Sequence, residues 1–282
     1  MNLEEFIPLE KSWLIRMGVL DIINGRRQII DVLEAQPAGS LGTDLEALLR
    51  AARLWGKGAV INIGESGTLY RFLLFANWTF DMGITFEVEG TLRTRQLTTD
   101  KSVVSLSVDE LLRLDANTSQ WASASVLFAD AKRPAGDLPY HLAMTFDAKK
   151  HWLKRVGCGA DWSPRKDSTI ARQARAYAGY LEIGQIDFKP MQAEDYCFAR
   201  AFGLMSAGEG EVRWPSLRQH ESDRIAEMER LLAADIIDSH DHRVVQALAM
   251  LGVEQLRFSD PTCVAKSWPQ FWKYLDVVRA GI

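Results

Sequence analysis

Apolar residues recur at helical spacing in two segments near the start of the chain. They are Leu14, Met17 and Leu20 in the segment Lys11–Asn24, then Leu45, Leu48, Leu49 and Ala52. Spacing of three to four residues places these side chains on one face of a helix, so both segments are predicted to be amphipathic helices. Thr43 and Glu46 precede the second apolar run at the spacing of a capping box, and we expect its helix to begin there.

Two short stretches have the character of strands. Ala59–Ile63 and Ile84–Val88 are rich in β-branched residues or alternate between apolar and polar residues, and each lies between turn residues. A polar turn followed by an apolar helix then repeats at 64–76, 116–129 and 193–207. Such repetition favours an α/β architecture, in which helices pack behind sheets and helix starts point to a shared cleft.

Composition and charge narrow the function. The chain has 282 residues, of which 47% are hydrophobic and 25% charged, which is enough for one large core or two moderate ones, and two domains are expected. A formal net charge of −4 gives no general attraction to nucleic acid or to an anionic membrane. Any anion site must therefore come from a local cluster of arginine and lysine.

Location and cofactor content are also constrained. No apolar run is long enough for a membrane span, and the first residues are acidic where a secretory signal would be basic. Three widely spaced cysteines, Cys158, Cys197 and Cys263, suit neither a disulfide framework nor a metal site. We expect a cytoplasmic protein without metal or cofactor.

The turn Gly64–Thr68 could hold an anion. It separates a predicted strand from a predicted helix that carries Arg71, and free N–H groups at a helix start favour negative charge. A glycine turn of this kind is more often purely structural. No lysine follows Gly67, so a Walker-type phosphate loop is not indicated.

Six segments in the same order resemble those of the EPSP synthase (3-phosphoshikimate 1-carboxyvinyltransferase) family. They are KSWLIR from Lys11, GESGTLYRFL, TSQWASA, HESDRIAEM, DHR and DPTCVAKSWPQFW. The resemblance implies a trimmed enolpyruvyl transferase fold, with two domains of repeated inverse βαβ-type units, helices inside and sheets outside. One domain would span 12–155 and the other 1–11 and 156–282, with the cleft between them.

The resemblance implies transfer of the enolpyruvyl group from phosphoenolpyruvate to shikimate 3-phosphate. The residues expected around phosphoenolpyruvate are Lys11, Gly67, Arg93, Arg224, Arg243 and Lys266. Those expected around the acceptor are Ser12, Arg16, Thr118, Ser119, Gln120 and His220. Charge-assisted hydrogen bonds from arginine suit both the phosphate and the carboxylate of phosphoenolpyruvate.

The reaction also needs groups that move protons. The resemblance offers Lys11, Glu221 and either Glu194 or Asp195. An ungapped alignment with the family selects Glu194, whereas a match of residue type selects Asp195. We favour Asp195 and keep Glu194 as the alternative. Glu221 lies one helical turn before Arg224, so the two side chains are expected on one helix face.

The chain departs from the family in ways that keep other functions open. It is much shorter than typical members, and His220 stands where the family has lysine. The alternatives are a related acceptor or a non-catalytic anion-binding paralogue. No cysteine lies near Arg93, which disfavours the related UDP-N-acetylglucosamine enolpyruvyl transferases. We expect a monomer whose partners are its small-molecule substrates.

Overall fold

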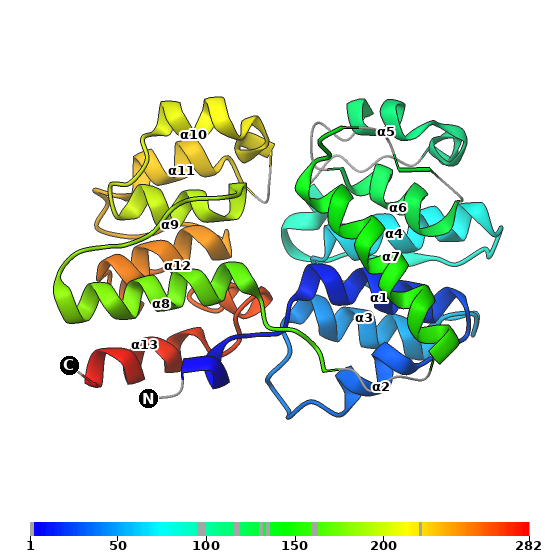
Figure 1. The fold of residues 1–282 in the computed structure, drawn as a ribbon, viewed down its shortest axis with the longest axis horizontal. Coiled ribbons are helices and arrows are strands. Elements are labelled where there is room, and N and C mark those ends of the chain that lie inside the picture. Colours follow the sequence, from blue (N-terminus) through cyan, green and yellow to red (C-terminus); the bar gives the residue numbers. More distant parts are fainter. Residues whose placement is uncertain are drawn as a thin grey trace. The chain divides into compact units, whose positions relative to one another are not determined.

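The computed structural model describes residues 3–94, 100–114, 119–129, 132–133, 136–158, 163–219 and 222–281, with backbone only for 156–158 and 219. The chain divides into two compact units (Figure 1). Unit 1 comprises Met1–Leu9 and Lys166–Ile282, and unit 2 comprises Glu10–Arg165.

Among its described residues, unit 2 contains seven α-helices, two 3₁₀-helices (labelled η) and two short strands. In order they are α1 (Lys11–Ile23), α2 (Gln28–Glu34), α3 (Thr43–Leu54), β1 (Ile61–Asn62), α4 (Gly67–Thr79), β2 (Phe86–Glu87), η2 (Gly90–Thr94), η3 (Lys101–Ser105), α5 (Val108–Leu114), α6 (Gln120–Phe128) and α7 (Tyr140–Cys158).

Unit 1 is helical wherever the structure describes regular elements in it. These are η1 (Leu3–Phe6), α8 (Ser168–Ile183), η4 (Ala193–Asp195), α9 (Tyr196–Ala201), α10 (Ala207–Arg213), η5 (Pro215–Gln219), α11 (Arg224–Leu231), α12 (His242–Leu251), η6 (Gln255–Arg257), η7 (Cys263–Lys266) and α13 (Phe271–Ala280).

The expected α/β fold with outer sheets is wrong. Across the described ranges the sheet content is one two-stranded sheet, in which β1 and β2 pair in parallel with Ile61 opposite Phe86. The strand-like stretches 59–63 and 84–88, the repeated turn–helix units and the family resemblance had all favoured sheets. Within the described ranges the structure forms strands only inside those two stretches, and the other regular elements are helical.

What remains of the expected repeat is one small β–α–β unit. β1 and β2 fall inside the predicted stretches 59–63 and 84–88, and α4 connects them. Parallel strands need such a crossover because a tight turn cannot join them. The backbone N–H groups of Ile61 and Ile63 donate to Thr85 and Glu87, 3.0 and 2.9 Å away, and the pairing ends within two residues.

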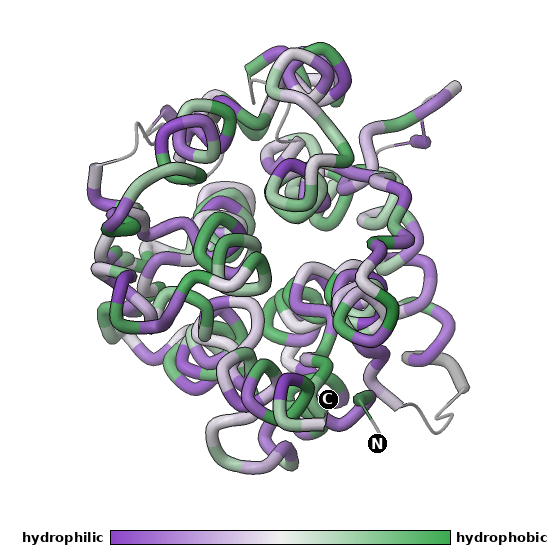
Figure 2. Tube along the Cα trace, turned by 90° about the vertical axis from the view of Figure 1, so that its left-hand side faces the viewer, coloured by the Kyte–Doolittle hydropathy of each residue, from purple (hydrophilic) through white to green (hydrophobic). Residues whose placement is uncertain are grey.

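The predicted helices at 11–24 and around 45–52 are confirmed as α1 and α3. The predicted capping box is wrong, because α3 begins at Thr43 itself, after Gly42, and no side chain caps it. Along most helical turns, hydrophobic and hydrophilic residues alternate (Figure 2). That alternation is expected of helices with one buried and one exposed face.

One helix in each unit is buried almost all round. In α1 every residue from Trp13 to Ile22 is buried, and in α12 every residue from His242 to Met250. Gly18 lets α3 approach α1 closely, since an added Cβ there would lie 2.5 Å from Leu48 Cδ2. These two helices organise the cores of their units.

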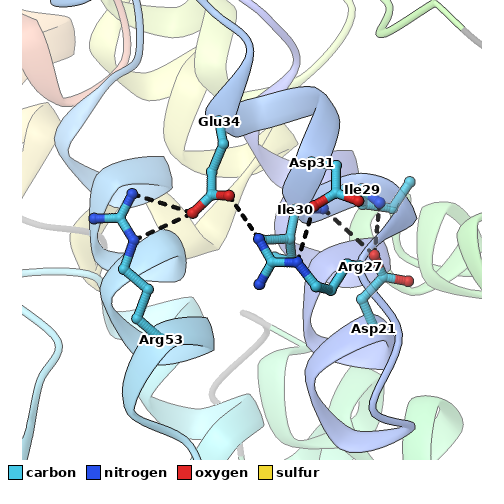
Figure 3. A network of polar contacts seen from close by, with 7 residues as sticks. All are labelled: Asp21, Arg27, Ile29, Ile30, Asp31, Glu34 and Arg53. Carbon is cyan, nitrogen blue, oxygen red and sulfur yellow. Dashed lines mark hydrogen bonds and ion pairs between the residues drawn. The ribbon is translucent and has the colours of Figure 1, made fainter.

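Asp21 fixes the corner between α1 and α2 (Figure 3). Its carboxylate is fully buried and accepts the backbone N–H groups of Ile29 at 2.6 Å and Ile30 at 3.4 Å, at the start of α2. The indole N–H of Trp152 on α7 donates to the other oxygen at 2.8 Å. Burial raises the pKa of Asp21, so these donors offset a real desolvation cost.

The ion pairs in Figure 3 lie on the surface. Arg27 pairs with Asp31 at 2.9 Å and with Glu34 at 2.6 Å, and Arg53 also contacts Glu34. The Arg27 and Asp31 side chains are 51% and 63% exposed. Exposed pairs of this kind contribute about 0–1 kcal/mol each.

Each unit also closes its own chain ends. In unit 1, Leu9 and Lys166 form an antiparallel bridge, and the Asp167 N–H donates to the Pro8 carbonyl at 2.8 Å. In unit 2, the Glu10 N–H donates to the Arg165 carbonyl at 3.0 Å. Unit 2 is thus an insertion whose first and last residues are hydrogen-bonded neighbours.

Asp21 and Asp31 provide a matched test of this description. Asp21→Ala should lower the free energy of unfolding by about 2–4 kcal/mol, because three buried donors lose their acceptor. Asp31→Ala should lower it by less than about 1 kcal/mol, because its partner is solvated. Urea denaturation of both variants measures the difference, and equal losses would show that Asp21 does not hold the corner.

Candidate functional site

In unit 2, two helix starts lie side by side. α4 begins at Gly67 and α6 at Gln120, and these helices pack against each other. The Gln120 amide Nε2 donates to Thr68 Oγ1 at 3.1 Å, while its Oε1 accepts from Arg71 Nη1. Arg71 also donates to the Gly67 carbonyl at 3.3 Å, so one guanidinium connects both helix starts.

A serine precedes each of these helices without capping it. Ser66 and Ser119 are 2% and 1% exposed, and neither makes a side-chain cap hydrogen bond. Both hydroxyl oxygens are buried, and neither has a hydrogen-bond partner among the residues that the structure describes. Ser119 also has a left-handed backbone, with φ of 54°. The first N–H groups of α4 and α6 therefore receive no cap from the serine that precedes each helix.

Lys11 is the first residue of α1. Its ammonium lies 2.8 Å from Asp44 Oδ2 on α3, and the two side chains are 18% and 8% exposed. A cation at a helix start opposes the helix dipole, and Asp44 compensates for it. Ser12 follows Lys11, and its carbonyl accepts from Arg16 Nη1 at 2.7 Å.

Arg16 is buried and contacts residues of α1, α4 and α7. Its Nε donates to Thr145 Oγ1 at 2.7 Å, and its Nη2 donates to the His141 carbonyl at 3.2 Å. The guanidinium also lies over the Phe72 ring, 5.3 Å from its centroid. Burial lowers the pKa of Arg16 to about 10. These contacts give Arg16 a structural role in the ligand-free protein.

Arg93 lies in η2 and is exposed, with its Nε 2.8 Å from the Val88 carbonyl. Glu65 holds η2 near α4 by accepting the Thr91 N–H at 2.9 Å. Gly90, at φ of 49°, leaves room for that carboxylate, because an added Cβ would overlap Glu65 Oε1. The position of Arg93 thus depends on Glu65 and Gly90.

In unit 1, Arg224 and Asp241 form a buried ion pair. Arg224 is the first residue of α11, and its Nε and Nη2 lie 2.8 and 3.2 Å from the two carboxylate oxygens. Asp241 also caps α12 by accepting the Arg243 N–H at 2.9 Å. One carboxylate therefore joins the starts of α11 and α12.

Arg243, the second residue of α12, is 6% exposed. Among the described residues its guanidinium makes one side-chain hydrogen bond, a long one of 3.5 Å from Nη1 to Gln246 Oε1. Gln246 donates to Ser267 Oγ at 3.1 Å, next to Lys266 at the end of η7. Arg224, Arg243 and Lys266 thus lie in one region of unit 1, and all three are buried.

Asp195 and Glu194 end η4 in different surroundings. Asp195 is fully buried, and its oxygens accept from Arg172 at 2.7 Å and Gln173 at 3.1 Å. The N–H groups of the two residues at 191 and 192 also donate to it. Glu194 is half-buried, and its backbone carbonyl accepts from Gln173.

Three expected site residues, Thr118, His220 and Glu221, lie outside the described residues. Within the described ranges, no group of three or more His, Cys, Asp or Glu side chains could hold a metal ion. No helix in that part of the chain is long and apolar enough to cross a membrane.

Sequence reasoning missed most partners of the expected site residues. Asp44, Thr145 and Arg172 reach their partners from 23 to 129 positions away in the chain. Nothing in local spacing identifies such pairs. Ser66 and Asp241 stood within the quoted motifs GESGT and DHR, and a search for uncapped helix starts and buried caps would have found them.

Comparison with known proteins gives one partial similarity. A 3-phosphoshikimate 1-carboxyvinyltransferase of Psychromonas ingrahamii is 27% identical to this chain over 133 residues. Those residues are 46% of this chain and 30% of the relative, so the chain spans less than a third of that protein's length. No known family model matches the chain, and no solved structure matches it significantly. The similarity is consistent with a distant relationship to that transferase.

The buried pair in unit 1 can be tested against an exposed cap. Asp241→Ala should lower the free energy of unfolding by about 3–5 kcal/mol, because it leaves Arg224 buried without its counter-ion. Asp223→Ala removes the cap of α11, where Asp223 accepts the Ala226 N–H, and should cost about 1 kcal/mol. Chemical denaturation monitored by circular dichroism compares them, and a small loss in Asp241→Ala would contradict the assignment.

Proposed function

We propose that this protein transfers the enolpyruvyl group of phosphoenolpyruvate to the hydroxyl of shikimate 3-phosphate and releases phosphate. The observation that carries the proposal is Arg243, a buried guanidinium at a helix start with no ion pair among the described residues. The partial similarity to a 3-phosphoshikimate 1-carboxyvinyltransferase supports the choice of substrates.

The location of Arg243 favours an anionic ligand. A buried cation costs free energy unless a negative charge accompanies it, and the positive end of a helix dipole adds to that cost. Arg224 faces the same problem and resolves it with Asp241, as Lys11 does with Asp44. For Arg243 the missing counter-charge would be the carboxylate or phosphate of phosphoenolpyruvate.

In the proposed reaction the acceptor oxygen bonds to C2 of phosphoenolpyruvate while C3 takes up a proton. The tetrahedral intermediate then loses phosphate by cleavage of the C2–O bond, and a proton leaves C3 to restore the double bond. The proton carriers would be Glu221, Lys11 and one of Glu194 and Asp195. Of these two residues Glu194 is the more exposed. Asp195 would first have to break its hydrogen bonds with Arg172 and Gln173.

A second candidate is a non-catalytic anion-binding protein. It is favoured by two observations on the expected proton carriers. Lys11 is held in an ion pair with Asp44, and both oxygens of Asp195 are occupied within a closed network. Both arrangements are compatible with anion binding, but both would impede proton transfer.

Phosphate release separates the two candidates. Purified protein is incubated with phosphoenolpyruvate and shikimate 3-phosphate, then with a panel of phosphorylated and unphosphorylated hydroxy acids. An enolpyruvyl transferase should release one phosphate for each enol ether formed, and only when an acceptor is present. Calorimetric binding of phosphoenolpyruvate, with no phosphate released from it in the presence of any acceptor, would establish the binding protein and refute the transferase.

Arg243→Met tests the cation at the start of α12. The substitution removes an uncompensated buried charge, so the ligand-free protein should be at least as stable as wild type. Affinity for phosphoenolpyruvate should fall at least about 10-fold, since a hydrogen bond to a charged group contributes about 1.5–3 kcal/mol. Thermal denaturation and calorimetric titration provide the two measurements.

Arg257→Met is the control for loss of a cation elsewhere in unit 1, because the Arg257 side chain is 40% exposed and donates to the backbone carbonyls of Asp235 at 2.6 Å and Ala234 at 2.7 Å. Loss of these hydrogen bonds can lower stability, but the affinity for phosphoenolpyruvate should stay at the wild-type value. Unchanged phosphoenolpyruvate affinity in Arg243→Met would remove the main support for the proposal.

Glu221→Gln tests proton transfer. Glutamine keeps the shape of the side chain but cannot titrate, so kcat should fall by about 10²–10⁴-fold while the dissociation constant of phosphoenolpyruvate changes little. Steady-state kinetics beside calorimetry on the same preparation distinguishes the outcomes. Parallel losses of binding and turnover would instead indicate that Glu221 positions a cation.

A further inference from the structure

We propose that protonation of His151 opens the contact that holds the two ends of unit 2 together. This contact, here called the end clasp, consists of Glu10, Trp13, His151 and Arg165. Glu10 and Arg165 are the first and last residues of unit 2, so both peptide links to unit 1 begin at the clasp. The inference is independent of the proposed function, and the family resemblance gives no role to any of these four residues.

Arg165 holds the clasp together through three contacts. Its backbone carbonyl accepts the Glu10 N–H at 3.0 Å, and its guanidinium forms an ion pair with the Glu10 carboxylate. The guanidinium carbon also lies over the Trp13 ring, 3.8 Å from the ring centroid. The Glu10 side chain is 8% exposed, whereas that of Arg165 is 49% exposed. Arg165 is therefore the member of the clasp that can move into water most easily.

His151, on α7, packs against the same tryptophan. The two ring centroids are 5.7 Å apart, and the ring planes meet at 62°. His151 Nε2 and Trp13 Nε1 are both buried, and neither has a hydrogen-bond partner among the described residues. A protonated imidazole carries an N–H on both nitrogens, so protonation would leave a buried, charged N–H without an acceptor there. Such a group is costly, and the closed clasp therefore favours neutral His151.

The charges around His151 act in the same direction. Among the described residues, the cations that face it are Lys154 and Arg155 on α7 and Arg165 in the clasp. Burial, followed by the charges of Arg155, Arg165 and Lys154, lowers the pKa of His151. The carboxylate of the clasp, that of Glu10, is already paired with Arg165. A charged His151 would thus repel the guanidinium that holds the clasp.

Other charged groups near α7 have partners of their own. The helices α1 and α6 pack against α7, and α6 contains no ionisable side chain. The charged residues of α1 and the acid one turn before His151 each contact another residue: Lys11 with Asp44, Arg16 with Thr145, Asp21 with Trp152, and Asp147 with Arg133.

Acid should therefore open the clasp. An open clasp exposes His151 to water, so the open form binds a proton more readily than the closed form. The closed form keeps its full stability above the ordinary histidine pKa of about 6.5, and loses it as the pH falls through the lowered pKa of His151. Loss of the Glu10–Arg165 contacts would loosen both chain segments that lead to unit 1.

Hydrogen exchange of the full-length chain tests the proposal. The backbone N–H of Glu10 is the reporter, because it donates to Arg165 in the closed clasp. Protection factors are compared at about pH 7.5 and about pH 5.5, after correction for the intrinsic effect of pH, and ordinary carboxylates stay ionised throughout this range. Amides of α4, in the core of unit 2, serve as the internal reference.

Three variants make the test specific. His151→Gln cannot titrate, and His151→Arg carries a permanent charge at the same position. His141→Gln is the matched control, because His141 is on the same helix but its ring packs on Tyr140, outside the clasp. Circular dichroism checks the fold of each variant, and if His151→Arg does not fold, the comparison of wild type with His151→Gln decides.

In wild type and in His141→Gln, protection of the Glu10 amide should fall by about 3- to 10-fold on acidification, while the α4 amides keep theirs. In His151→Gln the Glu10 amide should stay protected at both pH values. In His151→Arg it should be weakly protected at both.

Constant protection of the Glu10 amide in the wild type would overturn the proposal. So would an unchanged acid response in His151→Gln, because another group would then be responsible. An equal loss of protection in α4 would also refute it, since acid would then be unfolding unit 2 as a whole and not opening the clasp.

Discussion

Buried charged side chains need fixed partners, and this requirement determines how the helices of each unit are joined. Asp21 links α1 to α2 and α7, while Asp241 links the starts of α11 and α12. Asp195 ties η4 to α8 in the same manner. A sheet would supply such constraints through its backbone ladder, but here the strands pair over only two residues. A buried carboxylate tolerates little change in the position of its hydrogen-bond donors. These links therefore fix the positions of the joined helix ends more strictly than apolar packing does.

Helix positions could be predicted from the sequence, whereas the fold class could not. Apolar spacing identified α1 and α3, because the period of a helix is a local property of the chain. Sheets were expected from the strand-like segments 59–63 and 84–88, from the repeated turn–helix units and from the resemblance to longer proteins, but the structure pairs only two residues of each segment. The start of α3 was misjudged by one residue, since Thr43 adopts the first helical position and Gly42 takes the boundary.

The cationic residues of the candidate site could be identified from the sequence, but whether each has a counter-ion in the folded protein could not. Lys11, Arg224 and Arg243 each stand at the first or second position of a helix, which motifs alone could suggest. Whether each is neutralised depends on carboxylates brought near by folding, and only the structure separates the compensated Lys11 and Arg224 from Arg243. Arg224 and Arg243 are about equally buried, so the presence or absence of a carboxylate counter-ion among the described residues distinguishes the structural cation from the candidate ligand site.

The paired ends of unit 2 have a consequence for how such a protein could be built. Since Glu10 and Arg165 are hydrogen-bonded neighbours, and Leu9 and Lys166 bridge each other, the inserted segment enters and leaves unit 1 at a single point. A segment of this kind can be cut out, replaced or transplanted without stretching either remaining chain end, because a short turn could reconnect them. Because the inserted segment is continuous in the sequence, recombination could exchange it as one piece while the rest of the chain kept its own core.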